Sequence, residues 1–206
     1  ADSREDRPRR HASRPSSGDS VVREVAQTVR SAPFGWHIWH NNSFSPFFRA
    51  EQDYEKLRQT SDYLKVVIYN NCGGPRLQQY LKNVHSTIFR DAKPEEALAL
   101  HYRIMGYGDE AGFDKLPAAG LSADYVARET KRAVAGVRGE VAIYPGIDID
   151  IPTDQSEKKT QPSDVRASVK AALTSGAAGV ILSRKYSEMK LANLAAAGEA
   201  LKELSV

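Results

Sequence analysis

The chain has 206 residues, of which 41% are hydrophobic and 27% are charged, as is ordinary for a globular domain. Its formal net charge of +3 is small and its basic residues are interleaved with acids, which argues against a nucleic-acid partner. No apolar run approaches the ~20 residues that a membrane helix needs, so we expect no membrane partner, and the single cysteine, Cys72, excludes an internal disulfide.

Residues 1–19 form a compositionally distinct start of the chain. They contain no leucine, isoleucine, valine or aromatic residue and are rich in Arg, Ser and Pro. Such a segment cannot bury enough apolar surface to offset the entropy lost on ordering, so we expect a disordered tail. We assign residues 20–206 to one β/α domain.

Helix and strand patterns alternate along this domain. We predict strands over 34–40, 63–69, 141–149 and 179–183, and helices over 20–32, 50–60, 77–84, 94–105, 122–134, between Thr160 and Gly176, and over 188–204. Ser122, flanked by Leu121 and Val126, is the expected N-cap of its helix, and Thr160 that of the next.

The strands read as nearly continuous apolar runs, which is typical of a parallel sheet covered by helices. The fold class is therefore α/β with parallel β/α repeats, and four such units are half of a TIM-type barrel. The half-barrel either stands alone as a four-stranded sheet or is completed by a homodimer or by a missing N-terminal half-barrel.

Polar side chains follow each predicted strand. In parallel α/β folds, reactive groups lie just beyond the carboxyl ends of the strands. The substrate-binding candidates are His40, Asn41, Tyr69, Asn70, Asn71, Arg76, Arg184 and Tyr186. Either Trp39 or His40 is the expected aromatic platform, and residues 70–74 also fit a turn with positive φ. Amides and aromatic rings together suit a carbohydrate, because sugars offer both hydroxyls and apolar faces.

Two carboxylates, Asp148 and Asp150, end the strand-like run over residues 143–152. At a strand period of two both acids share one face, about 6–7 Å apart from the ~3.3 Å rise per residue. Two like charges at that spacing are costly unless something uses them. We therefore interpret the pair as the centre of a catalytic or substrate-binding site.

Two roles are open for this pair. In the first, one aspartate acts as nucleophile or base, the other orients it, and Glu188 is the candidate acid. In the second, the pair is neutralised at the rim by cations: Arg76, Arg184 and Lys185. We predict no metal site, because His37 and His40 point to opposite strand faces. We predict no cofactor, because Gly73-Gly74 opens no phosphate-binding motif.

Three stretches are similar to a known family: WHNNSFSPFFRA (39–50), LKVVIYNN (64–71) and SRKYSEM (183–189). Together they resemble the C-terminal half of bacterial (β/α)8-barrel proteins regarded as hypothetical glycoside hydrolases. The resemblance covers roughly residues 20–206. It implies that the four strands are the fifth to eighth of a TIM barrel, and that the substrate is a carbohydrate.

Residues 146–150 also resemble the DGxDxDxE motif of family 18 glycoside hydrolases. Pro145 stands in place of the first Asp and Pro152 in place of the Glu, so that family's substrate-assisted mechanism is not implied. In the large retaining clan of barrel hydrolases the nucleophile follows the seventh strand, a place that Asp148 or Asp150 would match, although that clan uses Glu there. Two alternatives to a glycoside hydrolase remain. The first is a non-catalytic carbohydrate-binding or scaffold barrel, which includes the case of an inactive fragment, and the second is a metal-dependent glycosyltransferase with a DxD motif.

Overall fold

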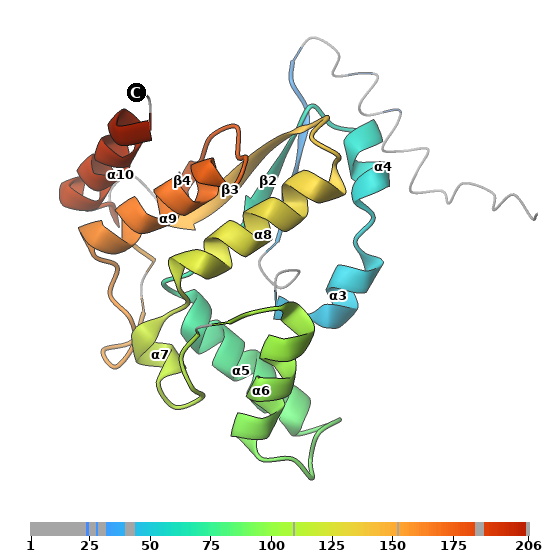
Figure 1. Cartoon of the computed structure of the whole chain (residues 1–206), viewed down its shortest axis with the longest axis vertical. Helices are drawn as coiled ribbons and strands as arrows, with labels where there is room; N and C mark the ends of the chain where they lie inside the picture. Colours follow the sequence, from blue (N-terminus) through green and yellow to red (C-terminus); the bar gives the residue numbers. More distant parts are fainter. Residues whose placement is uncertain are drawn as a thin grey trace, which may run out of the picture.

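The computed structural model of the chain describes residues 24, 28, 32–39, 44–108, 110–151, 153–183 and 188–204. A four-stranded, all-parallel sheet lies at its centre in the order β1-β2-β3-β4 (Figure 1). The strands are β1 (Gly35–Ile38), β2 (Tyr63–Val67), β3 (Ala142–Asp148) and β4 (Ile181–Ser183). The α/β class with parallel strands, predicted from four apolar runs, is confirmed. The expected tail and most of the helix expected over 20–32 lie outside the described residues.

Helices connect each strand to the next. The sheet is joined through α3 (Pro46–Glu51) and α4 (Tyr54–Gln59) after β1, through α5 (Gly73–His85), α6 (Pro94–Met105), α7 (Leu116–Ala119) and α8 (Ala123–Gly136) after β2, and through α9 (Pro162–Thr174) after β3, while α10 (Leu191–Leu204) follows β4. Parallel crossovers are right-handed, so a strand order that follows the chain order places the crossover helices on one face of the sheet. Figure 1 shows α8 and α9 side by side across that face, with α5, α6 and α7 beyond the end of the sheet.

The two faces of the sheet differ in burial. Toward α8 and α9 the strand side chains are at most 2% exposed: Leu64, Val66, Ile143 and Ile147. On the opposite face Tyr63, Lys65 and Tyr144 are only partly buried. The rings of Tyr63 and Tyr144 meet edge to face across β2 and β3, with 5.9 Å between their centroids. The hydrophobic core of the described residues therefore lies on the helix-covered side.

The start of α8 follows the sequence pattern closely. Ser122 is the N-cap, and its hydroxyl accepts a hydrogen bond from the backbone N–H of Tyr125 at 3.3 Å. Leu121 and Val126 are both buried on either side of it, as a hydrophobic staple requires. The next helix, α9, is instead capped at Gln161, one residue after the predicted Thr160.

The helix predicted over 50–60 is two short helices. Ser45 caps α3 by accepting the N–H of Phe48, and Asp53 caps α4 by accepting the N–H of Lys56. Two side-chain caps eight residues apart give each segment its own start, and the chain turns between them.

A close approach explains the paired glycines at the start of α5. A Cβ on Gly74 would lie 1.9 Å from the carbonyl oxygen of Leu116 in α7 and 2.9 Å from the Cα of Gly120. Neither Gly73 nor Gly74 has a positive φ, whereas Gly120 does, at +72°. The turn with positive φ considered for residues 70–74 is therefore not formed. Glycine is needed there because two helices touch.

Candidate functional site

Several of the sequence candidates lie outside the described residues: His40, Asn41, Arg184, Lys185 and Tyr186. The described candidates are Tyr69, Asn70, Asn71, Arg76, Asp148, Asp150 and Glu188. All of these lie at or beyond the carboxyl ends of the strands, as parallel α/β folds predict. They divide between a buried network and three cavities.

Asp148 belongs to the buried network. It is the last residue of β3, and its side chain is 0% exposed. Its carboxylate accepts hydrogen bonds from the backbone N–H of Cys72 at 2.7 Å and of Asn71 at 3.2 Å. Burial raises the pKa of Asp148 to about 6, although these N–H donors pull it in the opposite direction. The carboxylate thus ties the end of β3 to the chain that enters α5.

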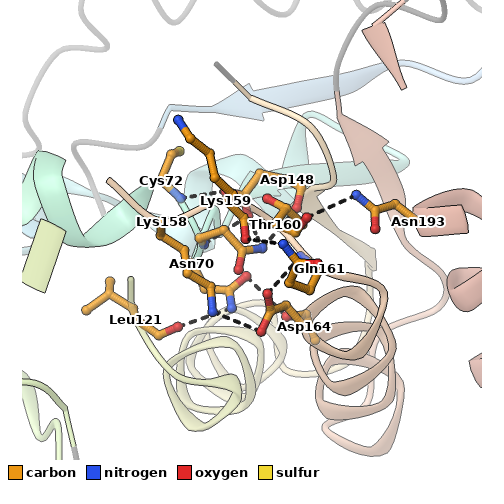
Figure 2. A network of polar contacts seen from close by, with 12 residues as sticks. Asn70, Cys72, Leu121, Asp148, Lys158, Lys159, Thr160, Gln161, Asp164 and Asn193 are labelled. Carbon is orange, nitrogen blue, oxygen red and sulfur yellow. Dashed lines mark hydrogen bonds and ion pairs between the residues drawn. The ribbon is translucent and has the colours of Figure 1, made fainter. Parts of the chain in front are cut away.

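The two asparagines after β2 also form hydrogen bonds around the strand ends, and Figure 2 shows Asn70 among its partners. The side-chain amide of Asn70 donates to the carbonyl of Leu121 at 3.2 Å, and its side-chain oxygen accepts from the hydroxyl of Ser168 at 3.1 Å. The amide of Asn71 donates to the backbone carbonyl of Asp148 at 3.2 Å. Both asparagines are nearly fully buried. Asn70 thus holds α9 and the start of α8 to the end of β2, whereas Asn71 links the ends of β2 and β3.

A cavity of about 370 Å³ lies between the starts of α8 and α9, and its polar lining comprises Asn70, Asn71, Glu110, Ser122, Lys158 and Asp164. Its charged groups are already paired. Glu110 accepts both the N–H and the hydroxyl of Ser122, at 2.8 and 2.7 Å. Asp164 accepts from Lys158 at 3.1 Å and caps the start of α9 through the N–H of Gln161 (Figure 2). This cavity offers a ligand few unsatisfied partners.

Asp150 contacts a different helix from Asp148. Its carboxylate accepts the backbone N–H of Lys190 at 2.7 Å and the side-chain amide of Asn193 at 3.2 Å, where α10 begins. The Lys190 ammonium lies 3.8 Å away. A carboxylate at this position also interacts favourably with the helix dipole. Because β3 ends at Asp148, the strand alternation does not extend to Asp150 and the two acids hold separate elements.

Asp150 and Glu188 nevertheless line one small cavity of about 210 Å³. Its wall also includes Lys159 and Lys190, and Glu188 is exposed. The structure therefore brings together two of the three carboxylates chosen from the sequence. It leaves Asp148 sealed beneath the start of α5.

A larger cavity of about 400 Å³ adjoins the one that Asp150 and Glu188 line, with Ile151 in both walls. It lies on the sheet face opposite the helices and is lined by Trp39, Lys65, Tyr69, Arg76, Ile151, Leu182 and Ser183. Trp39 is 59% exposed, whereas Trp36 packs against the core. The Arg76 guanidinium lies over the Tyr69 ring, 6.0 Å from its centroid. An exposed indole thus stands beside two cations and a phenol.

Gly146 leaves room for this lining. A Cβ at that position would lie 3.3 Å from the ring of Tyr69 and 3.4 Å from the side chain of Lys65. Both side chains come from the β2 segment and reach across β3 at this point. The absence of a side chain at Gly146 lets them lie there without displacement.

Lys65 is the lining residue that the sequence analysis missed. A signal for it exists, because Lys65 interrupts an apolar strand and shares its face with Tyr63 and Tyr69 at a period of two. In the part of the chain that the structure describes, no group of three or more His, Cys, Asp or Glu side chains could hold a metal ion. Likewise, none of its described helices is long and apolar enough to cross a membrane.

Comparison with known proteins identifies no relative of the chain. A scan against protein-family models and a search of curated proteins find no match for the chain. The resemblance to barrel glycoside hydrolases therefore stays an expectation, and what the chain does is argued below from its cavities and charges.

Proposed function

We propose that this chain binds a carbohydrate in the larger cavity at the strand ends. The observation that carries the proposal is the exposed Trp39 ring in one cavity with the polar groups of Lys65, Tyr69 and Arg76. A sugar places an apolar ring face on an aromatic platform while its hydroxyls bond to neighbouring polar groups. The volume of about 400 Å³ falls in the range of roughly 300–1,000 Å³ usual for small-molecule sites.

The contacts of the aspartates favour binding over catalysis. Asp148 is fully buried and accepts two backbone N–H groups, so no substrate atom reaches it in this arrangement. Asp150 holds the start of α10 through Lys190 and Asn193. Both therefore have structural partners that a nucleophile would have to release.

Glycoside hydrolysis is the second candidate, supported by the cavity that Asp150 and Glu188 share beside the sugar site. Hydrolysis needs two carboxyl groups about 5–9 Å apart, one of them as acid and the other as nucleophile or base. The exposed Glu188 would serve as the acid in this reading. The ligand would then extend from the Trp39 platform past Ile151.

The sheet is proposed to be half of a TIM-type barrel. A strand order without reversal and helices on one face are what such a half would show. A second copy or a further β/α segment would supply the other half. Light scattering after size exclusion tests the first case, in which the mass is twice that of the chain. In a monomer, the sheet face that carries Tyr63 and Tyr144 would be open to solvent, because no second half covers it. A monomer in which both tyrosines resist acetylation as strongly as the buried Tyr125 would contradict the half-barrel proposal.

The binding proposal is tested by calorimetry of the purified chain against a panel of neutral and acidic oligosaccharides. We expect Trp39→Ala to weaken binding about tenfold or more, because a stacked ring loses its platform. Phe47→Ala is the matched control, since Phe47 is 58% exposed on α3 and does not line the cavity. A chain that binds no saccharide of the panel would overturn the proposal.

Catalysis is tested with the same panel by measuring released reducing ends. Hydrolysis that Glu188→Gln abolishes, with binding intact, would favour the second candidate. Binding without any turnover would favour the first.

A further inference from the structure

The larger cavity holds two cations without counter-charges. Among the described residues, neither Lys65 nor Arg76 lies within ion-pair distance of a carboxylate. Some other cations of the described fold do form ion pairs, such as Lys158 with Asp164 and Arg58 with Glu55. The described lining of the larger cavity thus contains two cations and no carboxylate.

Lys65 is the more constrained of the two. Its stem lies on the sheet face between His37 of β1 and Tyr144 of β3. Burial lowers the pKa of Lys65, and the Lys65 charge contributes to lowering the pKa of His37. Asp148, the acid on the neighbouring β3, accepts the backbone N–H groups of Asn71 and Cys72 and forms no ion pair with Lys65. The ammonium is therefore in place for an anion that arrives from solution.

Arg76 brings a different geometry. It extends from the first turns of α5, and its guanidinium is held over the Tyr69 ring. Stacking leaves the edge of the guanidinium free to donate two parallel hydrogen bonds, which match a carboxylate or a sulfate. The side chain is itself exposed and so is accessible to a ligand.

We infer that the larger cavity takes an acidic saccharide, whose ring stacks on Trp39 while its carboxylate or sulfate groups pair with Lys65 and Arg76. This inference rests on the proposed carbohydrate function and names the substrate class of that site. A neutral sugar would leave both cations unpaired, whereas an acidic one neutralises them with charge-assisted hydrogen bonds.

The experiment compares ligands that differ only in charge. Calorimetry of the full chain uses uronic-acid trisaccharides (galacturonate, guluronate, mannuronate and glucuronate series), each beside its methyl ester, and a sulfated trisaccharide as a separate arm. We expect an acid form to bind about tenfold more tightly than its ester, because the ester removes the charge and keeps the shape. The uronate and sulfate arms show which acidic group the site prefers.

Two variants assign the effect to this cavity. Arg76→Gln and Lys65→Met should each weaken binding of the acid form at least fivefold and narrow its advantage over the ester. Arg103→Gln and Lys131→Met remove the same charges from exposed positions outside the cavity and should leave both affinities unchanged. Thermal melting of each variant checks that it is folded.

The outcomes separate the two proposals. An ester that binds as tightly as its acid would overturn the acidic-saccharide inference and leave carbohydrate binding standing. Equal losses in the control variants would show general charge attraction and would also overturn the inference. Absence of binding to every saccharide would instead remove the proposed function itself.

Discussion

The carboxylate of Asp148, the last residue of β3, accepts a 2.7 Å hydrogen bond from the backbone N–H of Cys72, at the entry to α5. This bond joins positions that are 76 residues apart in the chain. One of the two aspartates proposed from the sequence as catalytic therefore sits where β3 meets the helical segment of α5, α6 and α7.

The first prediction concerns pH. The folded pKa of Asp148 is about 6, above its reference value of 3.8, so between these values the unfolded state binds fewer protons than the folded one. Asp148 therefore favours folding most below about pH 4, and that contribution falls as pH rises to about 6. The loss is about 3 kcal/mol, at roughly 1.36 kcal/mol for each pH unit of difference.

Urea unfolding at pH 4 and pH 6.5 measures this dependence in the chain and in Asp148→Asn. The variant should lose most of the pH dependence, and at pH 4 it should be less stable by about 1–3 kcal/mol. At pH 4 the folded Asp148 is protonated, but its hydroxyl oxygen can still accept from one of the two backbone donors, whereas the amide NH2 of Asn is a donor only and leaves that N–H unpaired. Asp114→Asn, at an exposed position, is the control. An unchanged slope in Asp148→Asn would contradict the prediction.

The second prediction concerns Glu129 on α8, which is 1% exposed. It forms ion pairs with Arg49 and Arg132 and accepts a hydrogen bond from the Tyr107 hydroxyl. Glu129→Gln would leave two partly buried guanidinium groups without their anion, and we expect a loss of about 3–5 kcal/mol in the free energy of unfolding.

Glu203→Gln gives the matched comparison in urea unfolding. Glu203 also pairs with two cations, Arg166 and Lys170, but on the exposed surface of α9 and α10. Solvent screens that network, so its loss should be far smaller than the loss at Glu129. Equal effects in the two variants would show that burial does not strengthen the Glu129 cluster.

The third prediction concerns two glycines inside helices. Gly74→Ala places a methyl group 1.9 Å from the Leu116 carbonyl oxygen, so α7 must move and thermal stability must fall. Gly198→Ala in α10 meets no atom within 4 Å and should stabilise by about 0.5–1 kcal/mol, because alanine favours the helix. Differential scanning calorimetry should show melting temperatures that move in opposite directions, and a shared direction would refute the packing argument.

The fourth prediction links Gly146 to ligand affinity. Gly146→Ala, and more strongly Gly146→Val, would press on the Tyr69 ring and the Lys65 stem at 3.3 and 3.4 Å. We expect saccharide affinity to fall about threefold in the first variant and tenfold or more in the second, by displacement of both lining groups. Gly112→Val, where no atom lies within 4 Å, is the control for calorimetric titration. Unchanged affinity in Gly146→Val would place the ligand elsewhere.

Local signals predicted the elements that depend on local physics. The bounds of the helix over 94–105 are as predicted, and Ser122 caps α8 because its own hydroxyl satisfies the helix start. The four-residue helix α7 was not predicted, because a single helical turn that contains Pro117 is too short to show an apolar periodicity.

The site was less predictable from sequence for a physical reason. Alternation along a strand predicts where a side chain points only while the strand lasts, and β3 ends at Asp148. The position of Asp150 is set by Lys190, 40 residues later, and that of Asp148 by Cys72. Contacts over such separations leave no periodic signal in the sequence. Trp36 and Trp39 are three positions apart, so the strand period predicts opposite faces for them, and the structure does pack Trp36 against the core and expose Trp39.

The sheet has unequal strands. Its edge strands β1 and β4 have four and three residues, whereas the central β2 and β3 have five and seven. Short edge strands expose few unpaired backbone N–H and C=O groups, which limits aggregation by pairing with the strands of other chains. For the same reason, a second half-barrel that pairs with β1 and β4 would form few backbone hydrogen bonds to either edge strand. Contact between the two halves would then depend on side chains of the sheet face opposite the helices, such as Tyr63 and Tyr144. Replacing these aromatic residues would weaken the association more than proline substitutions in the edge strands.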